Sequence, residues 1–592
     1  MNEKTVFQLM AAGGTDLHIE TPCGGGGTCG KCKAIVSNPA SAPNETELRF
    51  LSDEDIKLGV RLICQCYPNA DSVVTAQKTE QTDQILSDAL DSPLHISPSI
   101  RKIYLGGNIW ENSKRDGARS LTELLEETLE IEALNVSLPV FRDLSGFLTG
   151  NHSPLPGVTV LLRGDKLLGA EEGDTTGELY GVAVDIGTTT VAAYLLNLAT
   201  GEVVGVASCL NPQIQHGADV VARIAYASEE AENLTRQSDE IIGAINKLAG
   251  ELAEGAALSR ERILHAVITG NTTMEHLALG ISPRDIGIAP FLPGFRFLLT
   301  QDAQEAGIAL HPRAGLDLLP NISGYIGGDT TAGVYYSQMA MSEDISLLVD
   351  IGTNNEVVIG NKDRILACST AAGPALEGAR IWQGMRGTAG AIERVKIRDG
   401  KVLTTVIGGG KALGICGSGV IDVLAEMLEN RIIDPGGKIQ KTNDDERLAS
   451  LIGRNEKGQL CFQISKDVVF SQKDVREAQL AKAAIGLGIA VLLEEAGIKP
   501  GDVSRLYLAG AFGNYIDIDN AIKIGLLPPL PRERIIPLGN AAGKGACAAL
   551  LNTQALSAMR DIARRARHIE LTSAPNFMDA FMSRLAFKRT DI

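Results

Sequence analysis

The chain has 592 residues, of which 44% are hydrophobic and 4% aromatic, and it carries a formal net charge of −17. This length is too great for one hydrophobic core, so we expect about three or four domains. The negative charge repels nucleic-acid phosphates and few rings are present to stack on bases, which excludes nucleic acid as a partner. The best apolar run, residues 483–493, is too short to span a bilayer, and the polar start MNEKTVFQLM is unlike a secretion signal. We therefore expect a cytoplasmic protein with no membrane partner.

A cysteine-rich segment lies near the start of the chain. Cys23, Cys29 and Cys32 form a C-x5-C-x2-C pattern, and Cys64 in RLICQCYP is a fourth candidate ligand. Thiolates are soft ligands that suit zinc or iron–sulfur clusters. Zinc sites usually combine two C-x2-C pairs, whereas the second part here offers only Cys64 and Cys66, so a [2Fe–2S] cluster is favoured and zinc stays the alternative. The glycines of CGGGGTC allow a loop to wrap a cluster with its N–H groups pointing inward.

This segment resembles a [2Fe–2S] ferredoxin domain with a β-grasp fold. The resemblance implies that Cys66 is a buried thiol outside the ligand set. The four cluster ligands that the resemblance implies are Cys23, Cys29, Cys32 and Cys64.

The beginning of this domain departs from the ferredoxin pattern, which opens with a β-hairpin before the first helix. Here residues 5–14, TVFQLMAAGG, already predict that helix. Either the start codon is assigned too late, or the domain lacks its first two strands, which would leave an unpaired sheet edge. Residues 71–77, DSVVTAQ, predict the closing strand, and we assign residues 1–80 to this domain.

A polar stretch with Ser-Pro breaks follows and predicts a linker over residues 81–100. We assign residues 101–179 to a small middle domain. Its sequence predicts one helix within residues 120–134 and strands within residues 158–170, and no chemistry can be derived for it.

From residue 180 onward the sequence contains an internal duplication. Residues 180–205, YGVAVDIGTTTVAAYLLNLATGEVVG, predict an apolar strand, a DxGT turn and two further strands, and residues 346–369 repeat this order. We assign residues 180–592 to one ATPase domain whose halves start near residues 180 and 346. The repeat pairs Asp185 with Asp350, Gly187 with Gly352, and Thr188 with Thr353.

The duplicated turns are suited to phosphate. A Gly-Thr turn between two strands places backbone N–H groups and hydroxyls around phosphate oxygens, and an aspartate at the end of the strand can hold Mg²⁺, usually through water. Two such turns in matching halves predict a cleft that clamps nucleotide phosphates from both sides. The candidate residues of the two turns are Asp185, Gly187, Thr188, Thr189, Thr190, Asp350, Gly352, Thr353 and Asn354.

Residues 180–592 resemble the actin-like ATPase superfamily, known as ASKHA, which has a ribonuclease H-like fold and includes sugar kinases, Hsp70 chaperones and actin. The resemblance implies that ATP and Mg²⁺ bind between the halves. Residues 325–334, YIGGDTTAGV, match the segment that carries a catalytic aspartate in sugar kinases of the superfamily, which makes Asp329 a third candidate catalytic residue.

Two glycine turns extend this resemblance. Residues 506–517, LYLAGAFGNYID, are similar to the adenosine loop of the superfamily, where Gly510 and Gly513 let the backbone approach a ligand. Residues 412–428, ALGICGSGVIDVLAEML, predict a turn that opens a helix, and Gly417 in that turn is a candidate contact to phosphate or ribose.

A ferredoxin domain in front of an actin-like ATPase is a specific combination, and the whole chain resembles the reductive activators of corrinoid-dependent enzymes. The resemblance rests on phrases such as NPQIQHGADVVARI, ITGNTTMEHLALG, DIGTNNEVVIGN, AAGPALEGARI and LAGAFGNYID. It implies that the protein uses ATP to pass one electron from its [2Fe–2S] cluster to cobalt(II) of a corrinoid protein of a methyltransferase system, which restores cobalt(I). It also implies a homodimer and a separate, unidentified electron donor.

The expected fold class is therefore multidomain α+β and α/β. It combines a β-grasp ferredoxin domain, a linker, a small middle domain and a duplicated actin-like ATPase domain. Three other functions stay open: a small-molecule kinase or ATPase with a regulatory iron–sulfur domain, an activator of radical dehydratases, and an electron-carrying scaffold with a degenerate ATP site. The kinase alternative would make Asp329 a general base, and the intact DxGT turns weigh against the scaffold.

Overall fold

The structure of the protein is a computed structural model. It describes residues 4–11, 32–39, 41–51, 53–69, 72–76, 96–107, 120–149, 157–298, 300–370, 372–378, 380–510, 515–574 and 576–588.

The N-terminal segment folds around a small antiparallel sheet in the order β2-β1-β3. Both the first helix and the closing strand predicted from the sequence are confirmed as α1 and β3. Among the described residues, β3 pairs with a neighbour along one edge only. The elements are α1 (Val6–Ala11), β1 (Lys33–Val36), α2 (Glu45–Phe50), α3 (Asp53–Lys57), β2 (Val60–Leu62) and β3 (Val74–Ala76).

A second small unit contains a four-stranded sheet in the order β4-β6-β7-β5. Leu125 and Leu144, from its two helices, pack with apolar side chains of one sheet face. Leu161 and Leu168 on the other face join the core of the following region, which anchors the unit to the main body. The predicted helix and strands are confirmed as α5, β6 and β7. The elements are β4 (Ile100–Leu105), α5 (Leu121–Leu129), β5 (Asn135–Val136), α6 (Leu138–Thr149), β6 (Val158–Arg163) and β7 (Lys166–Glu172).

The first half of the duplicated region contains a six-stranded sheet in the order β10-β9-β8-β11-β13-β12. Strand β8 pairs antiparallel with β9 and parallel with β11. Helices α7, α8 and α9 contribute to the core on the outer face. The elements are β8 (Tyr180–Ile186), β9 (Thr190–Asn197), β10 (Val203–Leu210), α7 (Val220–Glu229), α8 (Ala231–Gly255), β11 (Ile263–Gly270), α9 (Thr272–Ala278), β12 (Gln301–Asp302) and β13 (Gly315–Leu318).

The second half repeats this design with a six-stranded sheet in the order β24-β23-β14-β15-β16-β25. Strand β14 pairs antiparallel with β15 and parallel with β23, as β8 does with β9 and β11. The outer face is covered by α11, α13 and α14. The elements are β14 (Ser346–Ile351), β15 (Asn355–Gly360), β16 (Ile365–Thr370), α11 (Gly417–Glu429), α13 (Gln472–Ala496), β23 (Arg505–Ala509), α14 (Ile518–Lys523), β24 (Ile535–Gly539) and β25 (Arg567–His568).

Helices α10 and α15 contribute side chains to the cores of both halves, and α16 packs with them, so they lie between the two sheets. Two three-stranded sheets and two short helices are added to the second half. The elements are α10 (Gly328–Tyr336), α15 (Ala541–Leu551), α16 (Thr553–Arg565), β17 (Ala391–Arg398), β18 (Lys401–Val406), β19 (Gly414–Ile415), α12 (Glu446–Ala449), β20 (Ile452–Arg454), β21 (Leu460–Gln463), β22 (Val469–Ser471) and α17 (Phe577–Ser583).

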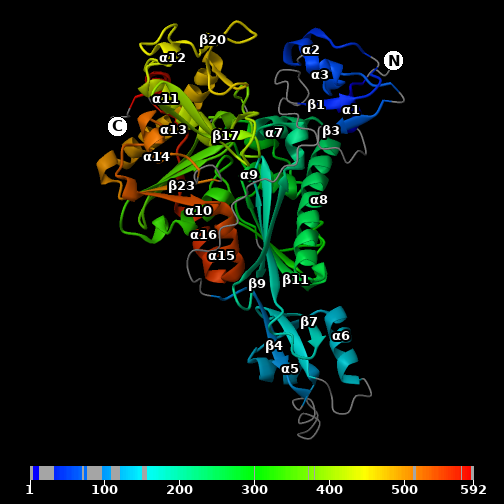
Figure 1. Ribbon diagram of the computed structural model, residues 1–592. Coiled ribbons are helices and arrows are strands. Elements are labelled where there is room, and N and C mark those ends of the chain that lie inside the picture. Colours follow the sequence, from blue (N-terminus) through cyan, green and yellow to red (C-terminus); the bar gives the residue numbers. More distant parts are fainter. Residues whose placement is uncertain are drawn as a thin grey trace.

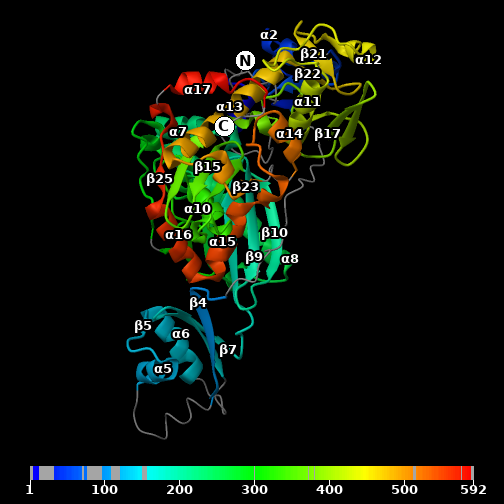
Figure 2. The same ribbon diagram turned by 90° about the vertical axis from the view of Figure 1, so that its left-hand side faces the viewer.

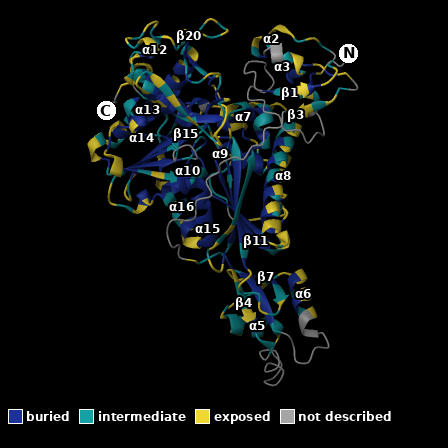
Figure 3. Ribbon diagram, viewed as in Figure 1, coloured by how far each residue is buried: buried dark blue, intermediate teal, exposed yellow. Residues whose placement is uncertain are grey.

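The arrangement places the N-terminal segment and the β4–β7 unit at opposite ends of the two-lobed region (Figures 1 and 2). The strands of both large sheets are mostly buried, whereas the outer surface of α8 is exposed (Figure 3). No described helix is long and apolar enough to cross a membrane. Each DxGT turn follows a buried strand of one large sheet, and the hydroxyls of Thr189 and Thr353 in the two turns lie 3.0 Å apart. The two turns thus face each other, as the duplication predicts.

Candidate active site

Two of the four predicted cluster ligands lie together in the described part of the N-terminal segment. The thiols of Cys32 and Cys64 are both buried, and their sulfur atoms lie 3.2 Å apart. The two thiols are not joined in a disulfide, and this separation allows both to bind one metal centre. Cys23 and Cys29 lie outside the described residues. The donor chemistry of the described pair thus fits an iron–sulfur cluster.

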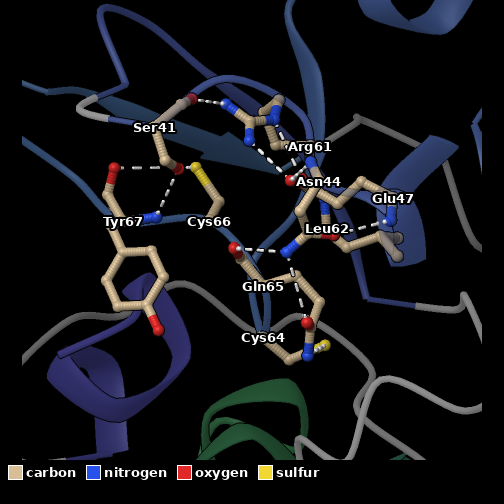
Figure 4. Close-up of polar contacts among 9 residues, drawn as sticks. All are labelled: Ser41, Asn44, Glu47, Arg61, Leu62, Cys64, Gln65, Cys66 and Tyr67. Carbon is tan, nitrogen blue, oxygen red and sulfur yellow. Dashed lines mark hydrogen bonds and ion pairs between the residues drawn. The ribbon is translucent and has the colours of Figure 1, made fainter.

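A buried ion pair supports the turn that carries Cys64 (Figure 4). Arg61 donates from Nε and Nη2 to the two carboxylate oxygens of Glu47, at 2.8 and 2.6 Å. Glu47 is fully buried and also accepts from the backbone N–H of Leu62 at 3.1 Å. Because breaking one partner of a buried pair leaves an uncompensated charge, this network fixes strand β2 against helix α2. The turn that holds the cluster ligand follows directly after that strand.

The structure separates Cys66 from Cys64. The sulfur of Cys66 is turned toward Ser41, away from the sulfur of Cys64 (Figure 4). Burial, the largest cause, raises the pKa of the Cys66 thiol to about 11, so it is protonated near neutral pH. Near Cys64, the side-chain amide of Gln65 donates toward the sulfur at 3.7 Å. The buried, protonated state of Cys66 agrees with its predicted place outside the ligand set.

The two phosphate loops meet across the interface between the halves. The hydroxyl oxygens of Thr189 and Thr353 lie 3.0 Å apart. The side-chain amide of Asn354 donates to the Thr188 hydroxyl at 3.2 Å. The sequence paired these turns by their motif alone, and the structure brings them into direct contact. Thr190 lies at the start of β9, where its carbonyl accepts the Gly187 N–H at 2.9 Å.

Two glycines of the predicted site are required by close backbone contacts. A Cβ at Gly187 would lie 2.6 Å from the Thr190 carbonyl oxygen. Gly510 has a φ of +90°, and a Cβ there would lie 2.8 Å from a carboxylate oxygen of Asp350. A side chain at either position would therefore displace the phosphate loop or the aspartate. Gly510 lies beside Asp350 because strands β14 and β23 pair in parallel.

The three predicted aspartates share one electrostatic environment. Burial raises the pKa of Asp185 to about 7, with a further contribution from Asp329. Burial likewise raises the pKa of Asp350 to about 8, and the nearby Asp329 and Asp185 add to the shift. Burial also raises the pKa of Asp329 to about 6. Each keeps part of its surface exposed, and a bound cation would favour the ionised form of these carboxyl groups, which burial disfavours.

Sequence reasoning missed other polar side chains of this site. Glu356 lies directly opposite Asp350 in the β14–β15 register, and burial raises its pKa well above the ordinary value. Glu377 accepts a hydrogen bond from the Thr353 hydroxyl at 2.8 Å. Asn271 donates to the Thr188 hydroxyl at 3.0 Å. The alternation of side chains in a hairpin could have revealed Glu356. Asn271 and Glu377 fall within the family phrases ITGNTTMEHLALG and AAGPALEGARI, but nothing in those phrases assigns either residue to the turns.

Helix α9 adds another buried carboxylate, Glu275, next to Asp329. Its pKa is raised well above the ordinary value by burial, with Asp329 contributing. One of its carboxylate oxygens accepts from Asn321 at 2.7 Å, and the other has no hydrogen-bond partner among the described residues. The acidic character of the site therefore extends beneath the three aspartates.

The described residues do not by themselves complete a metal site, since no group of three His, Cys, Asp or Glu side chains within them is arranged to hold an ion. The aspartates nevertheless fit an Mg²⁺ ion bound through water, because water molecules and the oxygens of nucleotide phosphates would supply the ligands that the protein lacks. Gly417 is the first residue of α11, and this helix packs against the short 3-10 helix Pro374–Glu377. Gly513 lies outside the described residues.

A duplicated fold with two opposed phosphate loops and a central acidic group defines an actin-like ATPase, here joined to a segment with paired thiolate ligands. Three family descriptions match the chain in agreement with this: "2Fe-2S iron-sulfur cluster binding domain" at residues 2–69, "RACo middle region" at 180–342, and "C-terminal domain of RACo the ASKHA domain" at 344–592.

Known proteins resemble the chain over almost its full length. It is 32% identical over 597 residues to "Corrinoid activation enzyme RamQ" of Eubacterium limosum, which covers 99% of this chain and 96% of that protein. It is 25% identical to "[Co(II) methylated amine-specific corrinoid protein] reductase" of Methanosarcina barkeri over 69% of this chain and 77% of that protein. A solved structure, "Reductive activator for corrinoid,iron-sulfur protein", has 33% identity and a TM-score of 0.75, and the match covers 99% of this chain and 96% of that one. The chain belongs to the RACo family of corrinoid-protein reductive activators, and as a member it is an enzyme.

Proposed function

We propose that the protein is an ATP-dependent reductive activator that transfers one electron to cobalt(II) of a corrinoid protein. The corrinoid protein gains the electron and its cobalt becomes cobalt(I); a reduced [2Fe–2S] cluster held by the N-terminal cysteines would supply that electron. ATP and water become ADP and phosphate in the same cycle. A separate electron donor then reduces the cluster again. The proposal keeps a homodimer as the functional assembly.

The observation that carries this proposal is the contact between the two phosphate loops in a chain that also holds a pair of cluster thiols. Thr189 and Thr353 come from opposite halves and lie 3.0 Å apart. A nucleotide whose phosphates insert between these hydroxyls must change the relative position of the halves, since both loops are continuous with buried strands. Binding energy can thus be converted into a conformational change, which is what an uphill electron transfer requires.

Within the cleft, each group of residues has a distinct role. The backbone of the turns and the hydroxyls of Thr188 and Thr353 bind phosphate oxygens. Asp185 and Asp350 would hold Mg²⁺ through water, and the positive charge of the ion would stabilise carboxylates that burial disfavours as anions. Asp329 at the start of α10 orients the attacking water. Gly510 and Gly513 allow the backbone to approach the adenosine.

In the N-terminal segment, Cys23, Cys29, Cys32 and Cys64 hold the cluster, which supplies one-electron chemistry when bound. Glu47 and Arg61 keep the Cys64 turn in place, and burial excludes water from both sulfurs of the described pair. The side-chain amide of Gln65 stabilises negative charge on the Cys64 sulfur.

The decisive experiment follows cobalt under anaerobic conditions. The reconstituted, reduced protein is mixed with a cobalt(II) corrinoid protein of a methyltransferase system, and the absorbance of cobalt(I) is recorded with ATP, with ADP and without nucleotide. We expect cobalt(I) to accumulate with ATP only. Cys64→Ser should abolish the reaction and the cluster spectrum together, whereas Asp350→Asn should abolish the reaction and leave the spectrum intact. Equal rates with and without ATP would contradict the proposal.

A further inference from the structure

The N-terminal segment contacts the second half of the ATPase region through an aromatic pair. Phe50, the last residue of α2, stacks on Trp382 with ring centroids 6.3 Å apart and planes inclined by 29°. The ammonium group of Lys457 lies 3.6 Å from the centre of the Trp382 ring and 4.8 Å from that of Phe50. A cation on an aromatic face is attracted by the ring quadrupole, so three segments far apart in sequence meet in one specific contact.

On the cluster side, this contact reaches the support of a ligand. Phe50 lies one helical turn after Glu47 in α2. Glu47 accepts from the backbone N–H of Leu62, which precedes the turn that carries Cys64. A force on Phe50 therefore acts on the helix that positions the cluster ligand.

On the ATPase side, the same contact connects with a phosphate loop. The backbone N–H of Trp382 donates to buried Asp474 at 2.7 Å. In the segment before it, the Gly378 N–H donates to the Ala375 carbonyl, and the Ile381 N–H donates to the Gly378 carbonyl. Glu377, within this segment, accepts the hydroxyl of Thr353 at 2.8 Å.

The Thr353 hydroxyl has one proton, which it donates to the Glu377 carboxylate. A phosphate oxygen bound at Thr353 would take that hydrogen bond and place negative charge beside the Glu377 carboxylate. Repulsion between the two anions would displace the segment that ends at Trp382.

We propose that Trp382 is a positioning residue, which docks the cluster-bearing segment through Phe50 while Thr353 donates to Glu377 and releases it when nucleotide phosphates take the Thr353 hydroxyl from Glu377. Release frees the segment to approach the corrinoid partner only after nucleotide is bound. This inference rests on the proposed ATP binding at the paired loops.

The fluorescence of Trp382 can report on this contact. The sequence contains one other tryptophan, Trp110, and replacing it leaves Trp382 as the sole source of tryptophan fluorescence. In the full-length Trp110→Phe protein, fluorescence quenching by acrylamide measures how far the Trp382 ring is exposed. Phe50→Ala should increase the quenching, because loss of the ring pair shifts the docked equilibrium by roughly tenfold. Phe50→Tyr keeps an aromatic ring and should show the same low quenching as the protein with Phe50. Leu48→Ala, at an exposed position of the same helix, serves as the matched control. Unchanged quenching in Phe50→Ala would overturn the dock.

The link to nucleotide is tested in the same proteins. Adding Mg²⁺ with a non-hydrolysable ATP analogue should increase quenching in the Trp110→Phe protein and leave the Phe50→Ala variant unchanged, because that variant is already undocked. An equal increase in both proteins would show a direct effect on Trp382 and overturn the link.

Equilibrium dialysis with the labelled analogue separates this inference from the proposed function. Binding without a change in quenching overturns the inference and leaves the proposed function standing. Absence of binding overturns the proposed function and the link together, while Phe50→Ala still decides whether the dock exists.

Discussion

The two halves of the ATPase region share a strand–turn–strand design but differ in what lies opposite their aspartates. In the first half, Asp185 on β8 is paired in register with Ala192 on β9. In the second half, Asp350 on β14 is paired with Glu356 on β15. Cross-strand neighbours on one face lie close together, so the second half brings two carboxylates side by side where the first has one. The duplication preserved the backbone and placed a second carboxyl group beside the aspartate in one half only.

The hydroxyl groups of the two turns also differ, because only the one in the second half donates to a carboxylate. Thr188 accepts hydrogen bonds from the amides of Asn271 and Asn354, which leaves its own proton available to a phosphate. Thr353 instead donates to the carboxylate of Glu377. For the proposed phosphate binding, this difference predicts that the first half can donate to phosphate at once, whereas the second must first break an internal hydrogen bond. Equivalent motifs thus perform unequal tasks, and four predictions test this asymmetry.

The largest expected effect concerns the aspartates in ATP hydrolysis. We expect Asp350→Asn to lower the turnover number by roughly 100-fold and Asp185→Asn by roughly tenfold, because Asp350 belongs to the half with the second carboxylate and contributes more to cation binding. Phosphate release measured against Mg²⁺ concentration checks both numbers. Asp363→Asn, on an exposed loop of the second half, is the matched control. Equal losses in the two variants would show that the halves contribute alike.

The second effect concerns nucleotide affinity. Thr188→Val removes a hydroxyl whose proton is available to a phosphate, and we expect a loss of roughly tenfold in affinity for the ATP analogue. Thr353→Val should cost roughly threefold, because phosphate binding there first breaks the bond to Glu377. Isothermal titration calorimetry measures both, and the Thr→Ser variants should bind like the unmodified protein. A greater loss of affinity in Thr353→Val than in Thr188→Val would show that the second half, and not the first, has its hydroxyl ready for phosphate.

The sequence alone was sufficient to predict the features that local sequence patterns determine. The order of strands around each DxGT turn, the pairing of Asp185 with Asp350, and the presence of a ferredoxin segment all follow from local patterns, and the RACo family match confirms the fold class. The proximity of the two turns was predictable because two copies of one phosphate-binding device are useful only when they face each other.

The partners of these residues were not predictable in the same way. Asn271 lies on a different strand–helix junction from Thr188, and it reaches the turn only because β11 packs in parallel beside β8. Glu377 comes from turns after β16 and carries no motif. Trp382 contacts Phe50 across parts of the chain with no sequence relation. Such contacts depend on tertiary packing, which residue types and spacing do not encode locally.

The third effect is on stability and concerns Glu356. Its pKa is raised by burial and by the neighbouring Asp329 and Asp350, so its stabilising contribution is present at acidic pH and is lost as the pH rises above the ordinary glutamate range. Glu356→Gln should therefore raise the melting temperature of the nucleotide-free protein by a few degrees at alkaline pH, with a gap that narrows toward about pH 5. Differential scanning fluorimetry across pH measures the gap, with Glu254→Gln on exposed α8 as the control. A gap that does not depend on pH would show that Glu356 is not strained as an anion.

The smallest effect concerns the first half. Here the buried residue His276 should lower the stability of the protein as the pH falls, whereas Glu356 in the second half lowers it as the pH rises. His276 on α9 lies within hydrogen-bonding distance of the Thr272 carbonyl at Nδ1 (2.7 Å), and its Nε2 accepts the Gly294 N–H at 2.9 Å, which requires a neutral ring with the proton on Nδ1. Burial lowers its pKa to about 4, so the stability that it supplies is complete above about pH 6.5 and is lost as the pH falls toward 4.

Replacing His276 with glutamine keeps one donor and one acceptor but removes the titration. Between about pH 7.5 and 5.5 the unmodified protein should lose about 1 kcal/mol of unfolding free energy relative to His276→Gln, and ATP turnover at neutral pH should be unchanged because the ring is outside the cleft contacts. Urea unfolding at the two pH values provides the measurement. If the two proteins lose stability in parallel, His276 is not the group responsible, and the acid sensitivity of the first half must come from its carboxylates, which would make the two halves alike in this respect.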